Sequence, residues 1–218
     1  MLQIDILTLF PEYFTSLLPV SILGRAQREG AVNVTAHDLR HFGVGKHQLT
    51  DDRPFGGGAG MVMLIEPIDA ALQKLGYAKN TPGELIALTS AKGPVFTQQT
   101  ATEWSKLARL CLICGHYEGV DERVVEHLID TEFRIGDYVL TGGEPAATVI
   151  IDAVSRLQPG VLGNPESLEG ESHSQPGVLG YPQYSRPASY KGWDVPEVLQ
   201  QGNHKLIEQF REQQRKRD

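Results

Sequence analysis

Short apolar runs and amphipathic segments alternate along most of the chain. The apolar runs predict strands at residues 3–9, 84–89, 110–114 and 131–135, and residues 32–37 alternate between apolar and polar as in a further strand. The amphipathic segments predict helices, of which the first ends near residue 18 and the others cover residues 21–29, 66–75, 98–107, 122–128 and 145–157. Strands that alternate with helices indicate an α/β fold with a mainly parallel sheet and helices on both faces.

The C-terminal part of the chain has a different composition. Residues 160–183 are rich in Gly, Pro, Ser and Glu and show little periodicity. This composition predicts a linker that stays mobile until a ligand orders it. A small helical segment is expected at residues 197–217.

Three glycine-bearing turns lie close together within residues 115–144. They contain Gly115 and Gly119, then Gly136, then Gly142 and Gly143. The first two turns follow predicted strands, and because glycine has no Cβ, a ligand can approach the backbone at such positions. We therefore predict one pocket, built largely from main-chain donors and acceptors. Such a pocket suits a flat heterocycle better than a metal ion or a scissile peptide.

The composition is that of an ordinary soluble domain, with or without a smaller appendage. The chain has 218 residues, of which 40% are hydrophobic and 22% charged, and a formal net charge of -7. No apolar run approaches the roughly 20 residues that span a bilayer. The N-terminus has no basic segment and carries Asp5 and Glu12, unlike a signal peptide, so we expect a cytoplasmic protein without membrane contact. The negative charge indicates that any RNA contact is a defined footprint and not a basic coat.

The two cysteines, Cys111 and Cys114, form a Cys-x-x-Cys inside a predicted strand. Residues three apart in a strand point to opposite faces. The chain also has no second pair of cysteines to complete a four-ligand zinc site. We therefore predict two buried core cysteines, and neither a redox pair nor a metal centre.

Other motif-like segments do not support common enzyme classes. Residues 56–60 are glycine-rich but lack the Gly-Lys-Ser/Thr ending of a P-loop and the spacing of a dinucleotide-binding loop. Their pattern fits both a flexible loop close to a substrate and a plain structural turn. His37 and His41 flank a segment whose second residue is Asp38, which differs from the zinc-protease motif, so we expect surface histidines and no metal site.

Three carboxylates follow the predicted strand at residues 110–114. Asp121 and Glu122 suit the start of a helix, where negative charge favours the macrodipole. Glu118 lies in the turn itself, where its carboxylate would suit a cationic ligand.

Seven short motifs occur in a fixed order between about Leu9 and His204: LFPE, DDRPFGGGAGM, GHYEGVDERV, IGDYVLTGGE, SRLQPGVLG, YPQYSRP and GNH. In this order they resemble the bacterial tRNA (guanine-N1)-methyltransferase family of the SPOUT class. The resemblance implies a knotted S-adenosylmethionine-binding domain at residues 1–160, with a trefoil knot in its C-terminal part. It also implies a flexible interdomain linker at residues 161–178 and a helical tRNA-binding domain at residues 179–218 that is shorter than usual.

The resemblance further implies that S-adenosylmethionine is bound in a bent form, mostly by the backbone of the knot. The family's cofactor-binding positions fall on Leu88, Thr89, Ser90, Gly115, Tyr117, Glu118, Gly119, Ile135, Gly136, Asp137, Tyr138, Val139, Leu140, Gly142 and Gly143. An obligate homodimer with active sites across its interface is also implied, as is a dependence of methyl transfer on magnesium.

Methylation of guanine at N1 has its own chemical requirements. N1 carries a proton, so a base must remove it as the methyl group arrives. Negative charge then develops on O6, where a fixed cation stabilises it. The family's catalytic arginine falls on Arg156, and its general base, an aspartate before a serine, falls on Glu171 before Ser172. Glutamate keeps the carboxylate and adds a methylene group, and Glu166 and Glu169 are alternative positions for the base.

The substrate that the resemblance implies is a tRNA with guanosine at position 37. RNA contacts are expected from Arg53, Phe55, Gly57 and Ser172. An arginine beside an aromatic ring suits a flipped purine through charge and stacking. Two alternatives stand beside this function: another SPOUT-type RNA methyltransferase with a different target base, and a cofactor-binding relative that has lost catalysis.

Overall fold

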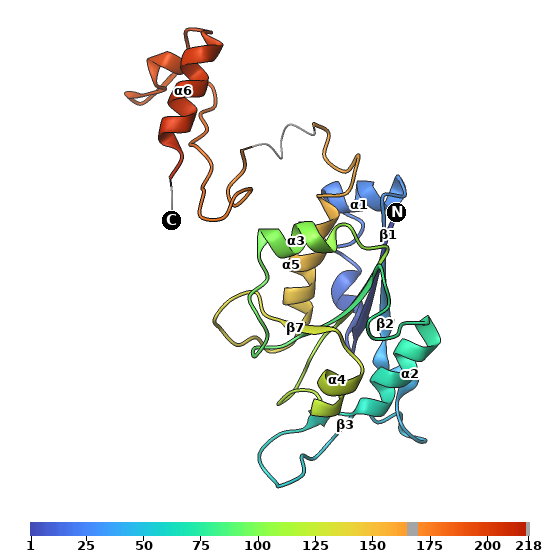
Figure 1. Cartoon of the computed structure of the whole chain (residues 1–218). Coiled ribbons are helices and arrows are strands. Elements are labelled where there is room, and N and C mark those ends of the chain that lie inside the picture. Colours follow the sequence, from blue (N-terminus) through green and yellow to red (C-terminus); the bar gives the residue numbers. More distant parts are fainter. Residues whose placement is uncertain (165–169, 217–218) are drawn as a thin grey trace. The chain divides into compact units, whose positions relative to one another are not determined.

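The structure is a computed structural model that describes residues 1–164 and 170–216. The chain divides into two compact units, Met1–Gly163 and Asn164–Asp218 (Figure 1). Glu166 and Glu169, the alternative positions for the general base, lie outside the described residues. In the described part of the chain, none of the helices has the length and apolar character needed to cross a membrane.

A five-stranded sheet forms the centre of the first unit, and every pair of neighbouring strands in it is parallel. The strand order is β2–β1–β6–β5–β7, with β1 at Leu2–Thr8, β2 at Val32–Asp38, β5 at Glu84–Thr89, β6 at Arg109–Ile113 and β7 at Thr131–Phe133. Parallel strands cannot be joined by tight turns, and the chain therefore crosses over the sheet between them. The predicted α/β fold with a mainly parallel sheet is confirmed.

Helices cover both faces of this sheet, as predicted. α1 (Ser21–Arg28), α3 (Gln98–Trp104) and α5 (Glu144–Ser155) pack on one face (Figure 1). α2 (Ile65–Leu75) and α4 (Glu122–His127) pack on the other. Because successive strand residues point to opposite sides, each face of the sheet buries a hydrophobic core of its own.

The alternation is clearest along β6 and the residue that follows it. Leu110, Leu112 and Cys114 enter the core under α1, α3 and α5, whereas Cys111 and Ile113 enter the core under α2 and α4. Both cysteines are buried and neither forms a disulfide. Burial raises the pKa of both thiols well above its usual value. The prediction of two core cysteines on opposite faces is confirmed.

The first predicted helix is shorter than the sequence pattern indicates. It forms only a 3-10 turn, η1 (Pro11–Phe14). The Thr15 hydroxyl donates a hydrogen bond of 2.8 Å to the Glu12 carbonyl, which competes with helical backbone bonding. Pro19 in addition disfavours helical backbone at the residue before it.

The last predicted helix is interrupted. In place of one helix over residues 197–217, the second unit contains a 3-10 turn, η4 (Glu197–Leu199), and α6 (His204–Gln214). Gly202 separates them with a φ of 72°, a conformation that favours glycine. The Asn203 side chain then accepts the Leu206 N–H at 3.3 Å and begins α6 as its cap.

The hydrophobic pattern did not predict two antiparallel hairpins, because each of their strands has only two residues. They are β3 (Asp51–Asp52) with β4 (Val62–Met63) in the first unit, and β8 (Ser189–Tyr190) with β9 (Trp193–Asp194) in the second. The first hairpin follows the 3-10 turn η2 (Leu39–Phe42) and closes the glycine-rich segment into a loop.

A buried carboxylate joins β1 to the elements around it. Asp5 is 4% exposed; its Oδ1 lies 2.7 Å from His37 Nε2 and its Oδ2 accepts the Tyr77 hydroxyl at 2.8 Å. Burial by itself would raise the pKa of Asp5, but hydrogen bonds from His37, Tyr77 and Gln3 outweigh it and hold the pKa below its usual value. His37, whose side chain is 22% exposed, is therefore a half-buried partner of a core carboxylate, whereas His41 is exposed as predicted.

This pairing makes the stability of the first unit sensitive to acid. Since the pKa of Asp5 in the folded state lies below its ordinary value of 3.8, its contribution is fully present above that pH and is lost as the pH falls through the folded value. We expect Asp5→Asn to lower the free energy of unfolding by about 1–3 kcal/mol at neutral pH. The difference from the unchanged protein should shrink in acid, as urea unfolding at stepwise lower pH will measure. A difference that does not vary with pH would contradict this account.

Candidate active site

A cavity of about 260 Å³ opens at the carboxyl ends of β5, β6 and β7. Its walls come from the residues that follow these strands and from the N-terminal parts of α4 and α5. Ligands bind at this edge of parallel α/β sheets because the loops of adjacent strands meet there. All three glycine-bearing turns that the sequence analysis singled out contribute to these walls.

Fourteen of the fifteen predicted cofactor-binding residues line this cavity, namely Leu88, Thr89, Ser90, Gly115, Tyr117, Glu118, Gly119, Ile135, Gly136, Tyr138, Val139, Leu140, Gly142 and Gly143. The exception is Asp137. Its carboxylate accepts a hydrogen bond of 2.8 Å from Arg134 Nε, and its side chain is 84% exposed. The fold thus gathers three segments that are distant in sequence around one space.

Close main-chain packing holds these segments together. The Gly143 N–H donates to the Gly115 carbonyl at 2.9 Å, and the Gly115 N–H donates to Thr89 Oγ1 at 2.9 Å. A Cβ on Gly143 would lie 1.9 Å from Thr89 Oγ1 and 2.7 Å from the Cα of Cys114. Gly143 is therefore required by the approach of two backbones, whatever ligand binds beside it.

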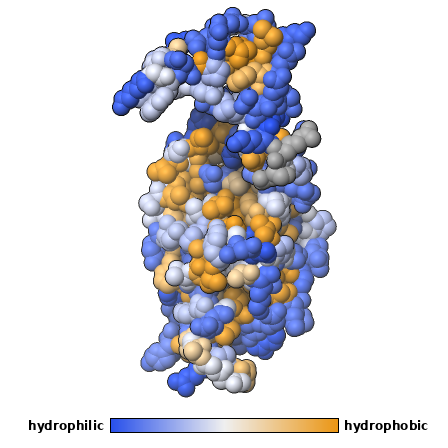
Figure 2. Space-filling view, turned by 90° about the vertical axis from the view of Figure 1, so that its left-hand side faces the viewer, coloured by the Kyte–Doolittle hydropathy of each residue, from blue (hydrophilic) through white to orange (hydrophobic). Residues whose placement is uncertain are grey.

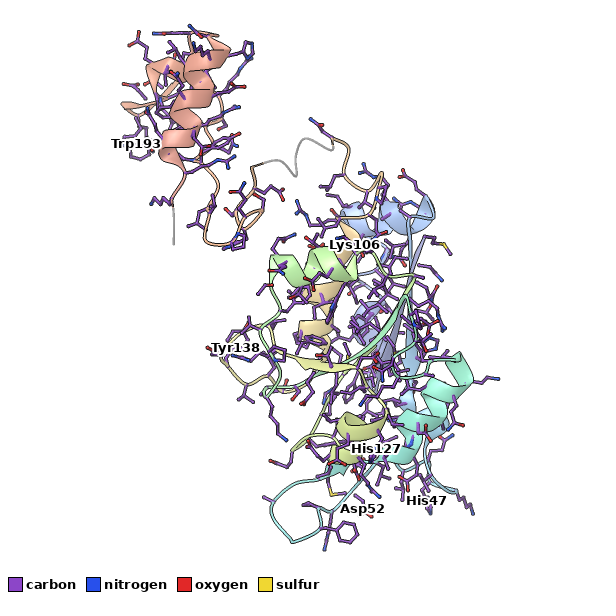
Figure 3. The ribbon with its side chains drawn as sticks, viewed as in Figure 1. His47, Asp52, Lys106, His127, Tyr138 and Trp193 are labelled. Carbon is purple, nitrogen blue, oxygen red and sulfur yellow. The ribbon has the colours of Figure 1, made fainter. Side chains whose placement is uncertain are left out.

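An irregular loop forms one side of the cavity. Residues 135–143 contain neither helix nor strand, and Tyr138, Val139 and Leu140 are 56%, 86% and 40% exposed. Tyr138 lies on this loop, at the edge of the first unit (Figure 3). The side of the unit that carries the loop shows hydrophobic groups gathered among polar ones (Figure 2). The loop thus exposes apolar side chains of its own, and its backbone forms neither strand nor helix.

A buried glutamate lies where this loop enters α5. Glu144 is 3% exposed; its Oε1 accepts the Thr8 hydroxyl at 2.5 Å and its Oε2 lies 2.7 Å from His116 Nε2. The His116 ring packs against Phe10, with ring centroids 5.0 Å apart. Glu144 and His116 were not among the predicted site residues. In the sequence, an acid in the first turn of a helix looks like an ordinary partner of the macrodipole.

The glycine-rich loop between β3 and β4 is attached to the rim of the cavity. The Glu118 N–H donates to the Met61 carbonyl at 3.0 Å, and the Met63 N–H donates to the Gly119 carbonyl at 3.0 Å. Gly60, with a φ of 78°, lies so close that a Cβ would be 2.5 Å from Glu118 Cγ. The base of this loop is therefore fixed to the segment that follows β6.

The far part of the same loop extends into solvent. Phe55 is fully exposed, and Arg53 is exposed with its N–H donating to Asp52 Oδ1 at 2.7 Å. Asp52 lies at the base of the loop (Figure 3). Gly57 has a φ of 79° within the turn. The predicted RNA-binding residues Arg53, Phe55 and Gly57 thus share one loop that begins and ends at the cavity rim.

Acidic groups outnumber basic ones along the cavity wall. Its charged side chains are Lys92, Glu118, Glu122, Glu132 and Arg134. Lys92 Nζ lies 3.3 Å from Glu122 Oε2, and Arg134 binds Asp137 outside the cavity. Tyr117, on the same rim, has its pKa raised by burial and by the neighbouring Asp51 carboxylate. This balance favours a ligand with positive charge.

Of the two predicted catalytic residues, Arg156 is not among the residues that line this cavity, and Glu171 belongs to the second unit. Arg156 directly follows α5, a helix of 12 residues whose first turn forms part of the cavity wall. At about 1.5 Å per residue, the helix places Arg156 roughly 18 Å from that end. Glu171 and Ser172 belong to the second unit, in which Ser172 Oγ accepts the Gly180 N–H at 2.8 Å. The chain therefore does not bring Arg156 into its own cavity.

The residues described in both units include no cluster of three or more His, Cys, Asp or Glu side chains that could hold a metal ion. His37, which the sequence analysis weighed as a metal ligand, instead faces Asp5 at 2.7 Å.

Comparison with known proteins gives a consistent result. Residues 2–218 match the family model described as tRNA (Guanine-1)-methyltransferase TrmD. The chain is 50% identical over 210 residues to a tRNA (guanine-N(1)-)-methyltransferase of Dehalococcoides mccartyi, covering 96% of this chain and 84% of that protein. It is 50% identical over 213 residues to the protein of the same name from Ruminiclostridium cellulolyticum, covering 98% and 91%. The corresponding protein of Geobacillus kaustophilus is 49% identical over 213 residues, covering 98% and 86%.

The packing of Gly143 leads to a test of the cavity's construction. We expect Gly143→Ala to lower the free energy of unfolding by about 1–3 kcal/mol, because the added methyl group displaces the backbone of a neighbouring segment. Urea unfolding measures this change. Gly163→Ala is the matched control, since a Cβ there would meet nothing within 4 Å. Equal stability of the two variants would show that the three segments do not need this close approach.

Proposed function

The chain belongs to the tRNA (guanine-1)-methyltransferase family, and from this premise we propose that it methylates N1 of guanosine 37 in tRNA with S-adenosylmethionine as the methyl donor. The family match over residues 2–218 and relatives at about 50% identity make it a tRNA (guanine-N1)-methyltransferase. The observation that supports the choice of cofactor is the cavity at the carboxyl ends of β5, β6 and β7, whose walls contain fourteen of the fifteen positions expected from the family.

The cavity has the properties that S-adenosylmethionine requires. Gly115, Gly142 and Gly143 leave the backbone accessible to a flat adenine ring. The acidic balance of the wall, with Glu118 on the segment after β6, suits a cation. When bound, S-adenosylmethionine supplies an electrophilic methyl group on a positively charged sulfur. The loop at residues 135–143, with Tyr138 and Leu140 exposed, would cover the cofactor and limit the access of water.

The glycine-rich loop is the proposed contact for the target guanosine. The C-terminal end of this loop is hydrogen-bonded to the segment that carries Glu118. A guanine ring held by the loop would therefore lie beside the cofactor cavity. Phe55 offers an exposed ring for stacking, Arg53 offers charge to the phosphate backbone, and Gly57 permits close approach. Ser172 is a further proposed contact, from the second unit.

The chemical step needs two groups from this chain. We assign removal of the N1 proton to the Glu171 carboxylate, which keeps the charge of the family's aspartate. The Arg156 guanidinium donates to O6 as negative charge develops there. Methyl transfer also requires that N1 lie in line with the sulfur–methyl bond of the bound cofactor, which is a task of positioning.

The place of Arg156 supports a composite site. Because α5 separates Arg156 from the cavity of its own chain, the arginine has to serve the cavity of another copy. A homodimer with two-fold symmetry supplies two such sites at one interface. The trefoil knot that the family resemblance implies stays a prediction.

The dependence of methyl transfer on magnesium and the location in the cytoplasm are proposals drawn from the family resemblance and from the tRNA substrate. Neither the role proposed for Glu171 nor that proposed for Arg156 involves a metal ion. A tRNA substrate places the proposed reaction in the cytoplasm.

The proposed reaction is tested with labelled S-adenosylmethionine and two tRNA transcripts, one with guanosine and one with adenosine at position 37. We expect transfer to the first transcript only, and a nuclease digest should locate the methyl group on N1 of that guanosine. Transfer to another nucleoside would point to a different target base. Cofactor binding without any transfer would point to a relative that has lost catalysis.

Arg156→Ala tests the proposed cation. We expect kcat to fall by about 10²–10³, as for loss of one oxyanion-stabilising donor, with little change in the affinity for S-adenosylmethionine. Arg156→Lys should recover part of the activity because it keeps the charge without the planar fork. Arg28→Ala, at the exposed end of α1, is the control. Full activity of Arg156→Ala would remove the arginine from the mechanism.

Mixing two defective variants tests the composite site. Arg156→Ala keeps its cavity, and Gly143→Ala keeps its arginine. If each cavity uses the arginine of the other subunit, random re-pairing of the two should restore about a quarter of the wild-type sites. Activity of the mixture is measured after co-refolding, with dimer formation followed by sedimentation. No recovery in mixed dimers would mean that Arg156 serves its own chain.

A further inference from the structure

The carboxylate of Glu144 lies where three chain segments meet, two of which contribute residues to the cavity wall. It accepts the hydroxyl of Thr8 from the end of β1 at 2.5 Å, and it lies 2.7 Å from the imidazole of His116 on the segment after β6. Glu144 itself directly follows Gly143, whose N–H donates to the Gly115 carbonyl at 2.9 Å. One buried side chain thus joins the two glycine-bearing turns on which the proposed cofactor site depends.

The side chains of Glu144 and His116 also pack closely against Gly142. A Cβ on Gly142 would lie 2.2 Å from His116 Cε1 and 2.7 Å from Glu144 Oε2. His116 is fixed from its other side by the Phe10 ring, 5.0 Å away between centroids. The backbone of Gly142, which forms part of the cavity wall, therefore packs directly against this pair.

A carboxylate this deeply buried is stable only with its partners in place. Glu144 is 3% exposed, and removal of a charge from water has to be compensated by hydrogen bonds. The two short contacts supply this compensation, and their strength depends on the distances between the segments. The arrangement therefore resists changes in the spacing of the loops.

We infer that Glu144 is a positioning residue for the cofactor: through Thr8 and His116 it sets the spacing between the turn at Gly115 and the turn at Gly142-Gly143. This inference rests on the proposed function for the identity of the ligand. If the inference holds, loss of Glu144 should weaken cofactor binding far more than it slows methyl transfer in the bound complex.

The chain offers a matched control for this role. Asp5 is also a buried carboxylate, 4% exposed, and it too pairs with an imidazole at 2.7 Å and a hydroxyl at 2.8 Å. It lies on β1, as does Thr8, but neither Asp5 nor its partners His37 and Tyr77 line the cavity. Asp5 variants should therefore lose stability without losing cofactor affinity.

The experiment compares Glu144→Ala, Glu144→Gln and Asp5→Asn with the unchanged protein. Calorimetry gives the dissociation constant for S-adenosylmethionine, steady-state kinetics with the guanosine-37 transcript gives KM and kcat, and urea unfolding gives stability. We expect Glu144→Ala to raise the dissociation constant and the cofactor KM by about tenfold or more, the effect of a lost charge-assisted hydrogen bond. Glu144→Gln should recover most of the affinity, since an amide can still accept from Thr8 and donate to His116.

The controls separate positioning from general destabilisation. Asp5→Asn should change the dissociation constant by less than about twofold, because its site is independent of the cavity. Unchanged affinity in Glu144→Ala, or an equal loss in Asp5→Asn, would overturn the inference. If Glu144→Ala does not fold, Thr8→Val takes its place, since it removes one of the two hydrogen-bonding partners of Glu144, and its dissociation constant should rise while that of Asp5→Asn does not.

A readout without ligand keeps this inference distinct from the proposed function. Amide hydrogen exchange at Gly115 and Gly143 reports the two hydrogen bonds that join the segments, each 2.9 Å long. Faster exchange at both amides in Glu144→Ala supports the inference even if no tRNA is methylated. Exchange at the wild-type rate overturns it even if methylation of guanosine 37 is established.

Discussion

The hydrogen bond between the Gly143 amide and the Gly115 carbonyl is the contact on which the cavity depends. It is 2.9 Å long and joins the turn before α5 to the turn after β6. Thr89, at the end of β5, completes the junction by accepting the Gly115 amide. Because a side chain at Gly143 would overlap Thr89 and Cys114, the junction exists only without one. The place where α5 begins, and with it the wall of the site, follows from this contact.

The strands and the glycine-bearing turns could be predicted from the sequence, because local patterns determine them. The central strands β5 and β6 are largely apolar and the edge strand β2 alternates, so the strands of the sheet were visible in the sequence. The opposite faces of Cys111 and Cys114 followed from the two-residue period of a strand. The glycine-bearing turns marked the cavity because close backbone approach needs glycine locally. Glu144 and His116 could not be found in this way, since their pairing depends on segments that only the folded chain brings together.

The proposed functions of the chain are divided among separate elements. The cavity is formed by the loops at the carboxyl edge of the sheet, whereas Arg156 lies beyond the other end of α5 and Glu171 belongs to the second unit. Under the proposed assignment, one chain could bind the cofactor completely without having a complete catalytic centre. If the proposed roles of Arg156 and Glu171 hold, assembly with a second copy and with RNA would control when the reaction is possible.

A wall made of main-chain atoms has a consequence for inhibition. A compound that hydrogen-bonds to side chains loses its partners when those side chains are exchanged, and resistant variants arise easily. At Gly115, Gly142 and Gly143 there is no side chain to exchange, and any addition at Gly142 or Gly143 meets atoms closer than 3 Å. Variants that shut out such a compound would also disturb the junction that forms the cavity, so escape from an antibacterial agent directed at these backbone groups would be coupled to loss of the fold around them.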